Sequence, residues 1–177
     1  MYRNSDIEKQ LRNRYKGHMN RENGAFFEYI IEAGCEYYRQ KGVADIEKTP
    51  EPMRPIKDIG GGKFIAYFQK AAQPDFKGVL SGGRAVVFEA KHTDTDQIEQ
   101  KRVSAEQAKN LEMAWKLGAE TFVLCSISDG FYRLPWEFWR DMKGILGRKY
   151  VTADDLRPYK IDIGGPGALL FLEGMMK

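Results

Sequence analysis

The sequence is poor in residues that build several common kinds of site. It contains only two cysteines and two histidines among 177 residues. Cys35 and Cys125 both lie in apolar stretches, so we expect buried free thiols in a reducing compartment, not a disulfide or a zinc site. With only His18 and His92 present, the composition argues against a histidine-rich metal centre and disfavours a Ser-His triad.

Long apolar runs are also missing. No stretch approaches the length of a membrane span, and the polar first residues do not resemble a secretory signal. We therefore expect a cytoplasmic protein that does not contact membranes. A length of 177 residues with 42% apolar content suits one globular domain with a hydrophobic core.

Two carboxylates and a lysine stand at the ends of two predicted strands. The apolar run 85–88 leads into Glu89 and Lys91, which point to the same face because strand side chains alternate. Asp75 opens the preceding strand, 76–80, and pairing of the two strands would bring it near Glu89. Because buried charges are costly, this set predicts a site for a hard divalent cation and a polarised water. A strand-end salt bridge is the alternative interpretation.

Basic residues gather in three segments although the net charge is only +3. Counting Lys and Arg against Asp and Glu gives +4 for residues 1–21, and +3 each for residues 54–77 and 139–160. An ordinary solvated surface explains any one of these segments. Their coincidence with a carboxylate site favours a nucleic acid as the partner.

The remaining pattern predicts an α/β sandwich with a central mixed sheet. Residues 1–20 lack apolar periodicity, so we expect a flexible arm there. Two β-prone segments flanking the glycines 60–62 predict a projecting hairpin over residues 56–68. The other expected elements are helices over 24–41, 104–117 and 168–176, and strands over 43–49, 121–127 and 130–134.

Asp75 and the string Glu89-Ala90-Lys91 resemble the active-site signature of the PD-(D/E)xK nuclease superfamily. A longer ordered set resembles the RecU-type Holliday junction resolvases over most of residues 20–173. Gln73 and Pro74 stand where that family often has hydroxyl residues, so the chain resembles a divergent, phage-borne member. The matching positions are Asn20, Arg21, Glu28, Thr49, Pro50, Tyr67, Phe68, Phe88 to Lys91, Gln107 and Gly147 to Lys149.

The resemblance implies a restriction-endonuclease-like fold over residues 21–177. It also implies a Mg²⁺-dependent endonuclease, with Mn²⁺ as a substitute, that cuts branched DNA at four-way junctions as a homodimer. Such an enzyme would be nucleoid-associated, or in the host cytoplasm if a phage encodes it. The implied catalytic residues are Asp75, Glu89, Lys91 and Gln107. The implied metal ligands are Glu28, Asp75, Glu89 and the main-chain carbonyl of Ala90.

The same resemblance assigns two DNA contacts. The arm would grip DNA, and the hairpin over 56–68 would enter the junction as a stalk. The basic residues expected at these contacts are Arg12, Arg14, Lys16, Arg21, Lys57 and Lys63.

Simpler roles remain open for two of the site residues. Glu28 alone is typical of a solvated helix residue, and Gln107 lies three residues after Ser104, as in a capping box. Two other functions also remain open. One is a nuclease of the same superfamily with another DNA substrate, and the other is a non-catalytic DNA-binding recombination factor.

Overall fold

The structure is a computed structural model that describes residues 3–50, 52–68, 73–164 and 167–174, with side chains from Glu22 onward. Its helices are α1 (Arg3–Gln40), α2 (Ala105–Lys116), α3 (Trp136–Arg140) and α4 (Met142–Leu146), with 3-10 turns η1 (Gln100–Arg102) and η2 (Arg157–Tyr159). Its longer strands are β1 (Ala44–Lys48), β2 (Met53–Gly60), β3 (Lys63–Phe68), β4 (Phe76–Leu80), β5 (Ala85–Thr93), β7 (Glu120–Ile127) and β8 (Gly130–Pro135). Its short strands are β6 (Gln97–Glu99), β9 (Tyr150–Thr152), β10 (Lys160–Ile161), β11 (Ile163–Gly164) and β12 (Ala168–Leu169).

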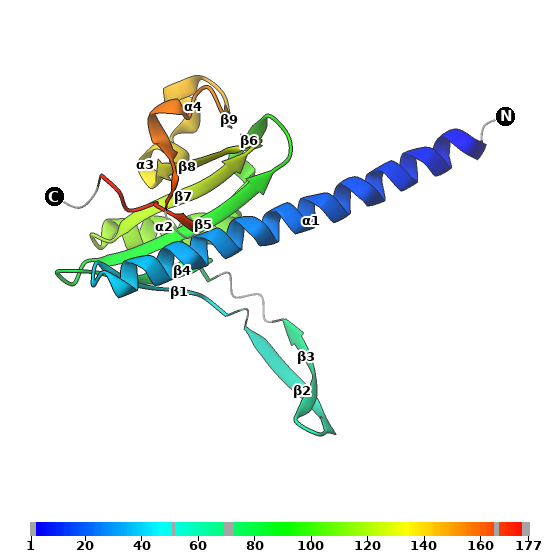
Figure 1. Cartoon of the computed structure of the whole chain (residues 1–177), viewed down its shortest axis with the longest axis horizontal. Helices are drawn as coiled ribbons and strands as arrows, with labels where there is room; N and C mark the ends of the chain where they lie inside the picture. Colours follow the sequence, from blue (N-terminus) through cyan, green and yellow to red (C-terminus); the bar gives the residue numbers. More distant parts are fainter. Residues whose placement is uncertain (1–2, 51, 69–72, 165–166, 175–177) are drawn as a thin grey trace.

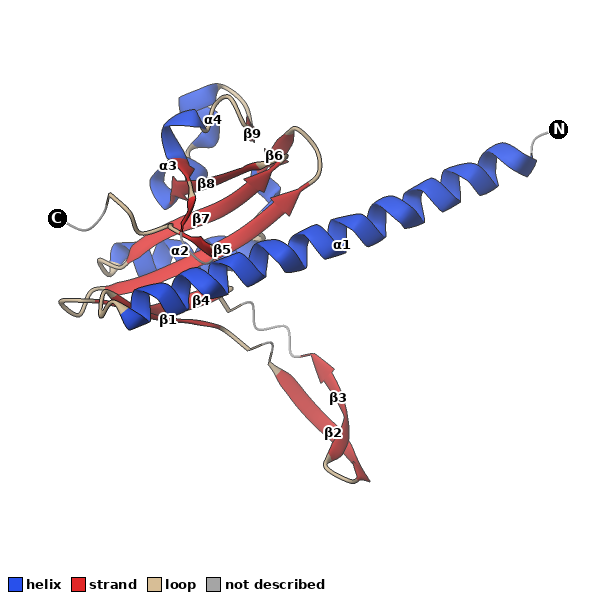
Figure 2. Ribbon diagram, viewed as in Figure 1, coloured by secondary structure: helices blue, strands red, loops and turns tan. Residues whose placement is uncertain are grey.

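A mixed sheet forms the centre of the molecule. Its strand order is β1-β4-β5-β7-β8-β10, with β5 and β7 parallel and the other neighbours antiparallel. Helix α1 covers one face of this sheet, while α2 and α3 cover the other (Figure 2). The predicted α/β sandwich with a central mixed sheet is confirmed.

Each face of the sheet has its own hydrophobic core. Under α1, Phe76, Phe88 and Phe122 stack across three neighbouring strands, with ring centroids 4.9 Å and 4.6 Å apart. Gly34 brings α1 against β12, since a Cβ there would overlap the Leu169 carbonyl oxygen. Under α2 and α3, a second core surrounds Trp139. Strand β5 contributes to both cores through Phe88 and Val87, and β4 contributes Phe76 to the core under α1; these are the strands that carry the predicted site.

The N-terminal segment differs from the expected flexible arm. Helix α1 does not begin near residue 24 but already at Arg3, and its first half extends beyond the sheet (Figure 1). Lys, Arg, Glu and Gln favour helix even without an apolar face, and an existing helix propagates at little cost. Residues 3–20 are therefore helical although the sequence has no apolar periodicity there.

The last predicted helix, over 168–176, is wrong for the residues that the structure describes. This segment forms β12 and a turn over residues 171–174, and residues 175–177 lie outside the described ranges. Leu169, Phe171 and Leu172 are all buried against α1 and the sheet. A segment buried on every side has no helical polar face, which explains why periodicity misread it.

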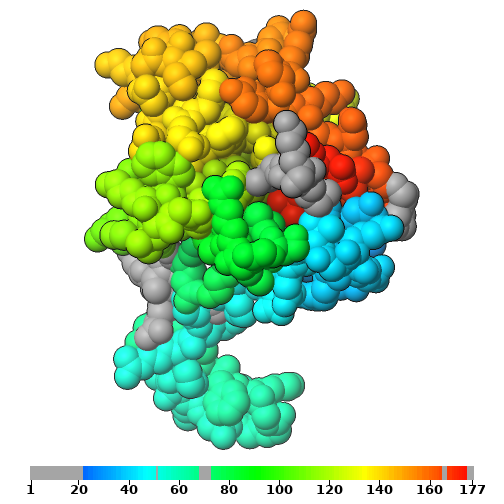
Figure 3. Space-filling model, turned by 90° about the vertical axis from the view of Figure 1, so that its left-hand side faces the viewer, coloured from blue at the N-terminus to red at the C-terminus, as the bar shows by residue number. Residues whose placement is uncertain are grey.

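The hairpin predicted over 56–68 is confirmed and begins three residues earlier. Strands β2 and β3 form a separate two-stranded sheet, which we call the stalk (residues 53–68). It stands clear of the body of the molecule (Figures 1 and 3). All three glycines at its tip, residues 60–62, have positive φ angles of 63° to 81°, which glycine adopts without strain.

Two further observations concern the cysteines and the helices. Cys35 and Cys125 are free and buried, as expected. Within the described ranges, no helix combines the length and the apolar character needed to cross a membrane.

Candidate metal-dependent nuclease centre

Strands β4 and β5 bring the three predicted charged residues together. Asp75 precedes the antiparallel pair Phe76–Phe88, so it faces the start of Glu89-Ala90-Lys91. Its Oδ2 accepts hydrogen bonds from the Ala90 amide at 2.9 Å and from Lys91 Nζ at 3.1 Å. Lys91 Nζ also donates to Glu89 Oε2 at 2.8 Å. The ammonium group therefore lies between the two carboxylates, and the predicted proximity of Asp75 and Glu89 is confirmed.

This centre is buried on the α2 side of the sheet. Phe88 packs under α1, so the alternating side chains of Glu89 and Lys91 face α2. Glu89 is fully buried, and the Lys91 side chain is 12% exposed. Burial raises the pKa of Glu89 to about 8; the Lys91 charge opposes this and Asp75 reinforces it. Burial alone would lower the pKa of Lys91, but Asp75 and Glu89 outweigh it and the pKa is raised.

Gln107 completes the expected capping box and also contacts Glu89. At the start of α2, its amide N–H donates to the Ser104 hydroxyl at 3.2 Å, and its side-chain oxygen accepts from the Ser104 amide at 3.1 Å. Its Nε2 donates to Glu89 Oε2. The capping box thus holds the Gln107 amide in place against the buried carboxylate.

Glu28 is not brought to this centre, contrary to the expected ligand set. It is exposed on α1, where its Oε2 accepts a hydrogen bond from Lys48 Nζ at 2.7 Å. Glu32 shares the same ammonium at 3.2 Å. Position 28 follows the buried Phe27, so the helix turns its side chain outward, and Lys48 neutralises it there. The described residues contain no group of three or more His, Cys, Asp or Glu side chains suited to a metal ion.

The remaining residues still fit a hard divalent cation. Glu89 Oε1 is buried, and among the described residues it has no hydrogen-bond partner. A buried acceptor left without a donor is costly, so a cation at this oxygen would relieve the cost. Mg²⁺ typically takes one or two protein carboxylates and completes its octahedron with other oxygens. Asp75 and Glu89 meet that requirement.

The residues expected to bind DNA lie apart from the centre. Lys57 and Lys63 are exposed on the stalk. The expected arm contacts lie on the first half of α1, where side chains fall outside the described part of the structure. These are Arg12, Arg14, Lys16 and Arg21.

A hydrogen-bonded group on the α1 side of β5 was missed by sequence reasoning, which assigned His92 no role. His92 Nδ1 lies 3.1 Å from Ser126 Oγ, and Nε2 lies 2.8 Å from Asp94 Oδ1. Asn23 on α1 donates to the same Asp94 oxygen at 3.0 Å. This group links α1, β5 and β7 one residue after Lys91. No sequence signal reveals it, because it depends on the parallel register that pairs His92 with Ser126.

A mixed sheet that presents two carboxylates and a lysine from adjacent strands defines the PD-(D/E)xK class of nuclease folds. The model of the family "RecU: Recombination protein U" matches residues 22–176. The chain therefore belongs to the RecU family.

Curated relatives agree with this family. A protein called Holliday junction resolvase RecU from Streptococcus equi subsp. zooepidemicus (strain MGCS10565) is 32% identical over 161 residues, covering 85% of this chain and 78% of the relative. A protein of the same name from Streptococcus pneumoniae (strain CGSP14) is 30% identical over 149 residues, covering 79% and 75%. A solved structure of Hjc, a Holliday junction resolvase from Archaeoglobus fulgidus, superimposes with a TM-score of 0.44 at 15% identity, covering 73% of this chain and 91% of Hjc.

Proposed function

We propose that this protein is a metal-dependent endonuclease that cuts four-way DNA junctions. The observation that carries the proposal is the buried Glu89 carboxylate, whose Oε1 lacks a partner among the described residues while Oε2 is held by Lys91 and Gln107. Such a carboxylate is arranged for a cation and gains little in a protein that only binds DNA. The names of the RecU relatives supply the junction as the substrate.

In this proposal Asp75, Glu89 and the Ala90 carbonyl would hold one Mg²⁺ or Mn²⁺ ion, with Gln107 beside it. The ion supplies Lewis acidity that makes a water acidic and neutralises charge on the phosphate. Glu89 must lose its proton to serve as a ligand, and Gln107 fixes the orientation of its carboxylate. Lys91 stays charged, because its pKa is raised, and stabilises negative charge that develops on the phosphate. We assign it this electrostatic role in preference to that of a base.

Two centres are needed for a productive cut. One Asp75–Glu89–Lys91 set cuts one strand, so symmetric resolution of a junction requires two copies related by a two-fold axis. The stalk supplies a projecting element with exposed Lys57, Lys63 and Phe64 that can read the shape of the branch. We therefore propose that a homodimer acts, with both stalks directed at the junction.

The test is cleavage of a labelled four-way junction beside linear duplex and single strand, with Mg²⁺ or with EDTA. We expect nicking of the junction with Mg²⁺ only. Asp75→Asn should abolish cleavage while junction binding changes little, because it removes a cation ligand and no phosphate contact. Asp129→Asn, at an exposed turn, is the matched control.

Other outcomes would identify the alternatives. Equal cutting of duplex and junction would favour another substrate within the nuclease superfamily. Junction binding without cleavage by the unaltered protein, at any Mg²⁺ or Mn²⁺ concentration, would favour a non-catalytic recombination factor.

A further inference from the structure

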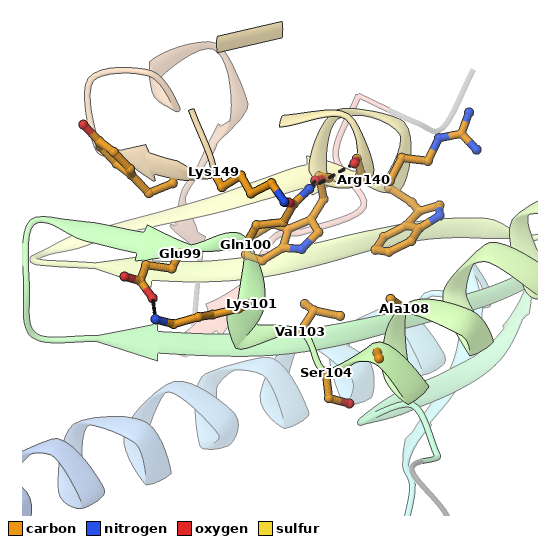
Figure 4. A pocket seen from close by; sticks show the side chains of 12 residues that line it. Glu99, Gln100, Lys101, Val103, Ser104, Ala108, Arg140 and Lys149 are labelled. Atoms are coloured by element: carbon orange, nitrogen blue, oxygen red, sulfur yellow. Dashed lines mark hydrogen bonds and ion pairs between the residues drawn. The ribbon is translucent and has the colours of Figure 1, made fainter. Parts of the chain in front are cut away.

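A second hollow lies beyond the nuclease centre. A pocket of about 620 Å³ opens between η1, α2, α3 and β9 (Figure 4). Pockets of this size accept small molecules or single residues of a polymer. The side chains that matter for its chemistry are Val103, Ala108, Trp136 and Trp139 on its apolar part, and Gln100 and Lys149 on its polar part.

The wall around Trp139 is held in place by hydrogen bonds between η1 and α3. Gln100 Nε2 donates to the carbonyl oxygens of Trp139 at 2.7 Å and of Arg140 at 3.0 Å, which ties η1 to α3. The Trp139 indole N–H is buried and, among the described residues, has no hydrogen-bond partner. In contrast, the Trp136 indole N–H donates to Glu112 at 2.8 Å. The side of the pocket that η1 and α3 form is therefore held in place by hydrogen bonds, and it includes apolar side chains.

One positive charge at the pocket is available to a ligand. Lys101 pairs with Glu99, and Arg140 pairs with Glu112 at 3.1 Å and turns away from the pocket (Figure 4). Lys149 is exposed and has no ion pair among the described residues. Its side chain extends over the pocket toward Gln100 (Figure 4). The pocket thus joins an apolar wall to one free ammonium group, which suits a ligand with a flat apolar part and an anionic group.

The pocket and the nuclease centre share one turn of helix. Ser104, Ala105 and Ala108 line the pocket from the start of α2, and Gln107 in the same turn reaches Glu89. One helical turn spans about 5 Å, comparable to the spacing between neighbouring residues of a polymer. The pocket therefore lies beside the same helical turn that contacts Glu89.

We propose that the pocket receives one nucleotide of the DNA strand beside the bond that is cut. The base lies against the apolar wall, and Lys149 contacts the phosphate. This inference rests on the proposed function, because it takes the strand from the nuclease centre. An acidic peptide shares the same charge, but only a strand bound at Glu89 has to pass α2 at this point. Unpaired bases are the least costly to unstack, so we expect the pocket to take a nucleotide that is unpaired at the branch point.

Two variants change residues that line the pocket and leave Asp75, Glu89 and Lys91 in place. Ala105→Trp places a large side chain at an exposed position on the rim, and Lys149→Ala removes the free charge. Lys143→Ala is the matched control, because Lys143 is an exposed lysine of the same segment that does not line the pocket. Circular dichroism and thermal unfolding establish that each variant is folded.

The experiment uses the complete chain in EDTA and two probes that carry 2-aminopurine. One is a short single-stranded oligonucleotide, and the other is a four-way junction labelled in turn at each position beside the cleaved bond. We expect a fluorescence change at one junction position that Ala105→Trp abolishes and Lys143→Ala retains. We expect Lys149→Ala to weaken oligonucleotide binding about fivefold to tenfold and to lower the slope of log affinity against log salt by about one.

The outcomes separate this inference from the proposed function. If the unaltered chain cuts junctions but neither variant changes the fluorescence or the cut positions, the pocket does not bind DNA and the nuclease stands. If the oligonucleotide signal depends on Ala105 and Lys149 while no junction is cut, the pocket stands and the proposed function fails. Binding of an acidic peptide, with no oligonucleotide signal, would overturn the inference in favour of a protein partner.

Discussion

Glu89→Gln should stabilise the metal-free protein at high pH while abolishing cleavage. The buried carboxyl has a folded pKa of about 8, against an ordinary value of 4.5. Because the folded pKa is raised, the stability that the protonated group contributes is fully present below pH 4.5 and is lost as the pH rises through about 8. The amide side chain of the variant cannot ionise, so this loss should disappear. Its oxygen can still accept the hydrogen bonds from Lys91 and Gln107 that now reach Oε2.

The size of the effect follows from the same two values. Between pH 4.5 and about 8, each pH unit lowers the free energy of unfolding by about 1.4 kcal/mol. The total loss of stability above pH 8 is therefore at most about 5 kcal/mol. For a chain of this length, 1 kcal/mol corresponds to a Tm change of about 2–4 °C. At pH 9 we expect the variant to melt about 5–20 °C above the unaltered protein, and at pH 4.5 we expect nearly equal melting temperatures.

Thermal and urea unfolding across pH 4.5 to 9 in EDTA measure this difference. Glu47→Gln, at an exposed carboxylate on β1, is the control and should change stability by less than about 0.5 kcal/mol at any pH. Added Mg²⁺ should raise the Tm of the unaltered protein at pH 9 by mass action and leave Glu89→Gln unchanged. If the stability of Glu89→Gln and that of the unaltered protein change with pH in the same way, the pKa of Glu89 is not raised, and Glu89 is not the buried, protonated carboxyl that we describe.

Three further predictions concern other parts of the chain. Replacing residues 57–66 by a short Gly-Ser turn should abolish the preference for junctions over duplex in a gel assay; a variant that stays dimeric in sedimentation and still prefers junctions would contradict the stalk role. Deleting residues 1–20 should weaken DNA binding and flatten its salt dependence without lowering the Tm, and an unchanged slope would mean that these residues do not touch phosphates. Gly34→Ala should cost about 1–3 kcal/mol in urea unfolding, because its Cβ would meet the Leu169 carbonyl, whereas Gly24→Ala in the same helix meets nothing within 4 Å and should stabilise by about 0.5–1 kcal/mol. Equal effects of the two alanines would contradict the close approach of α1 to β12.

Sequence patterns predicted the central elements well because local rules decide them. The apolar run before Glu89 and the Ser104–Gln107 capping box both appear in the structure where they were expected. Sequence patterns gave wrong predictions where tertiary packing determines the secondary structure. Residues 168–172 are all apolar, which does not distinguish a helix from a strand, and they pack in the core beside Gly34 as β12 and a turn. Residues 3–20 gave no packing signal, and the backbone is helical all the same.

Only the part of the candidate site that lies on the β4–β5 hairpin could be predicted from the sequence. Asp75 and Glu89 lie on neighbouring antiparallel strands, so their proximity follows from strand pairing alone. Glu28 lies on α1, and its position depends on how the helix is rotated over the sheet, which no local pattern determines. The neighbours of Glu28 at the end of β1 include Lys48, and that charge accounts for its placement. The parallel register of β5 with β7 places His92 beside Ser126, and local sequence patterns do not predict this register either.

The position of Lys91 explains how two carboxylates can remain adjacent before a cation binds. Asp75 and Glu89 together would carry two negative charges, and the Asp75 charge opposes the ionisation of Glu89. Lys91 lies within 3.1 Å of one and 2.8 Å of the other and supplies a single positive charge. That charge cannot fully offset the burial of Glu89, whose pKa stays raised, and it leaves Oε1 without a partner among the described residues. When Glu89 ionises, Asp75, Glu89 and Lys91 together carry one net negative charge, and the cation of the proposed function would compensate it by replacing the Glu89 proton.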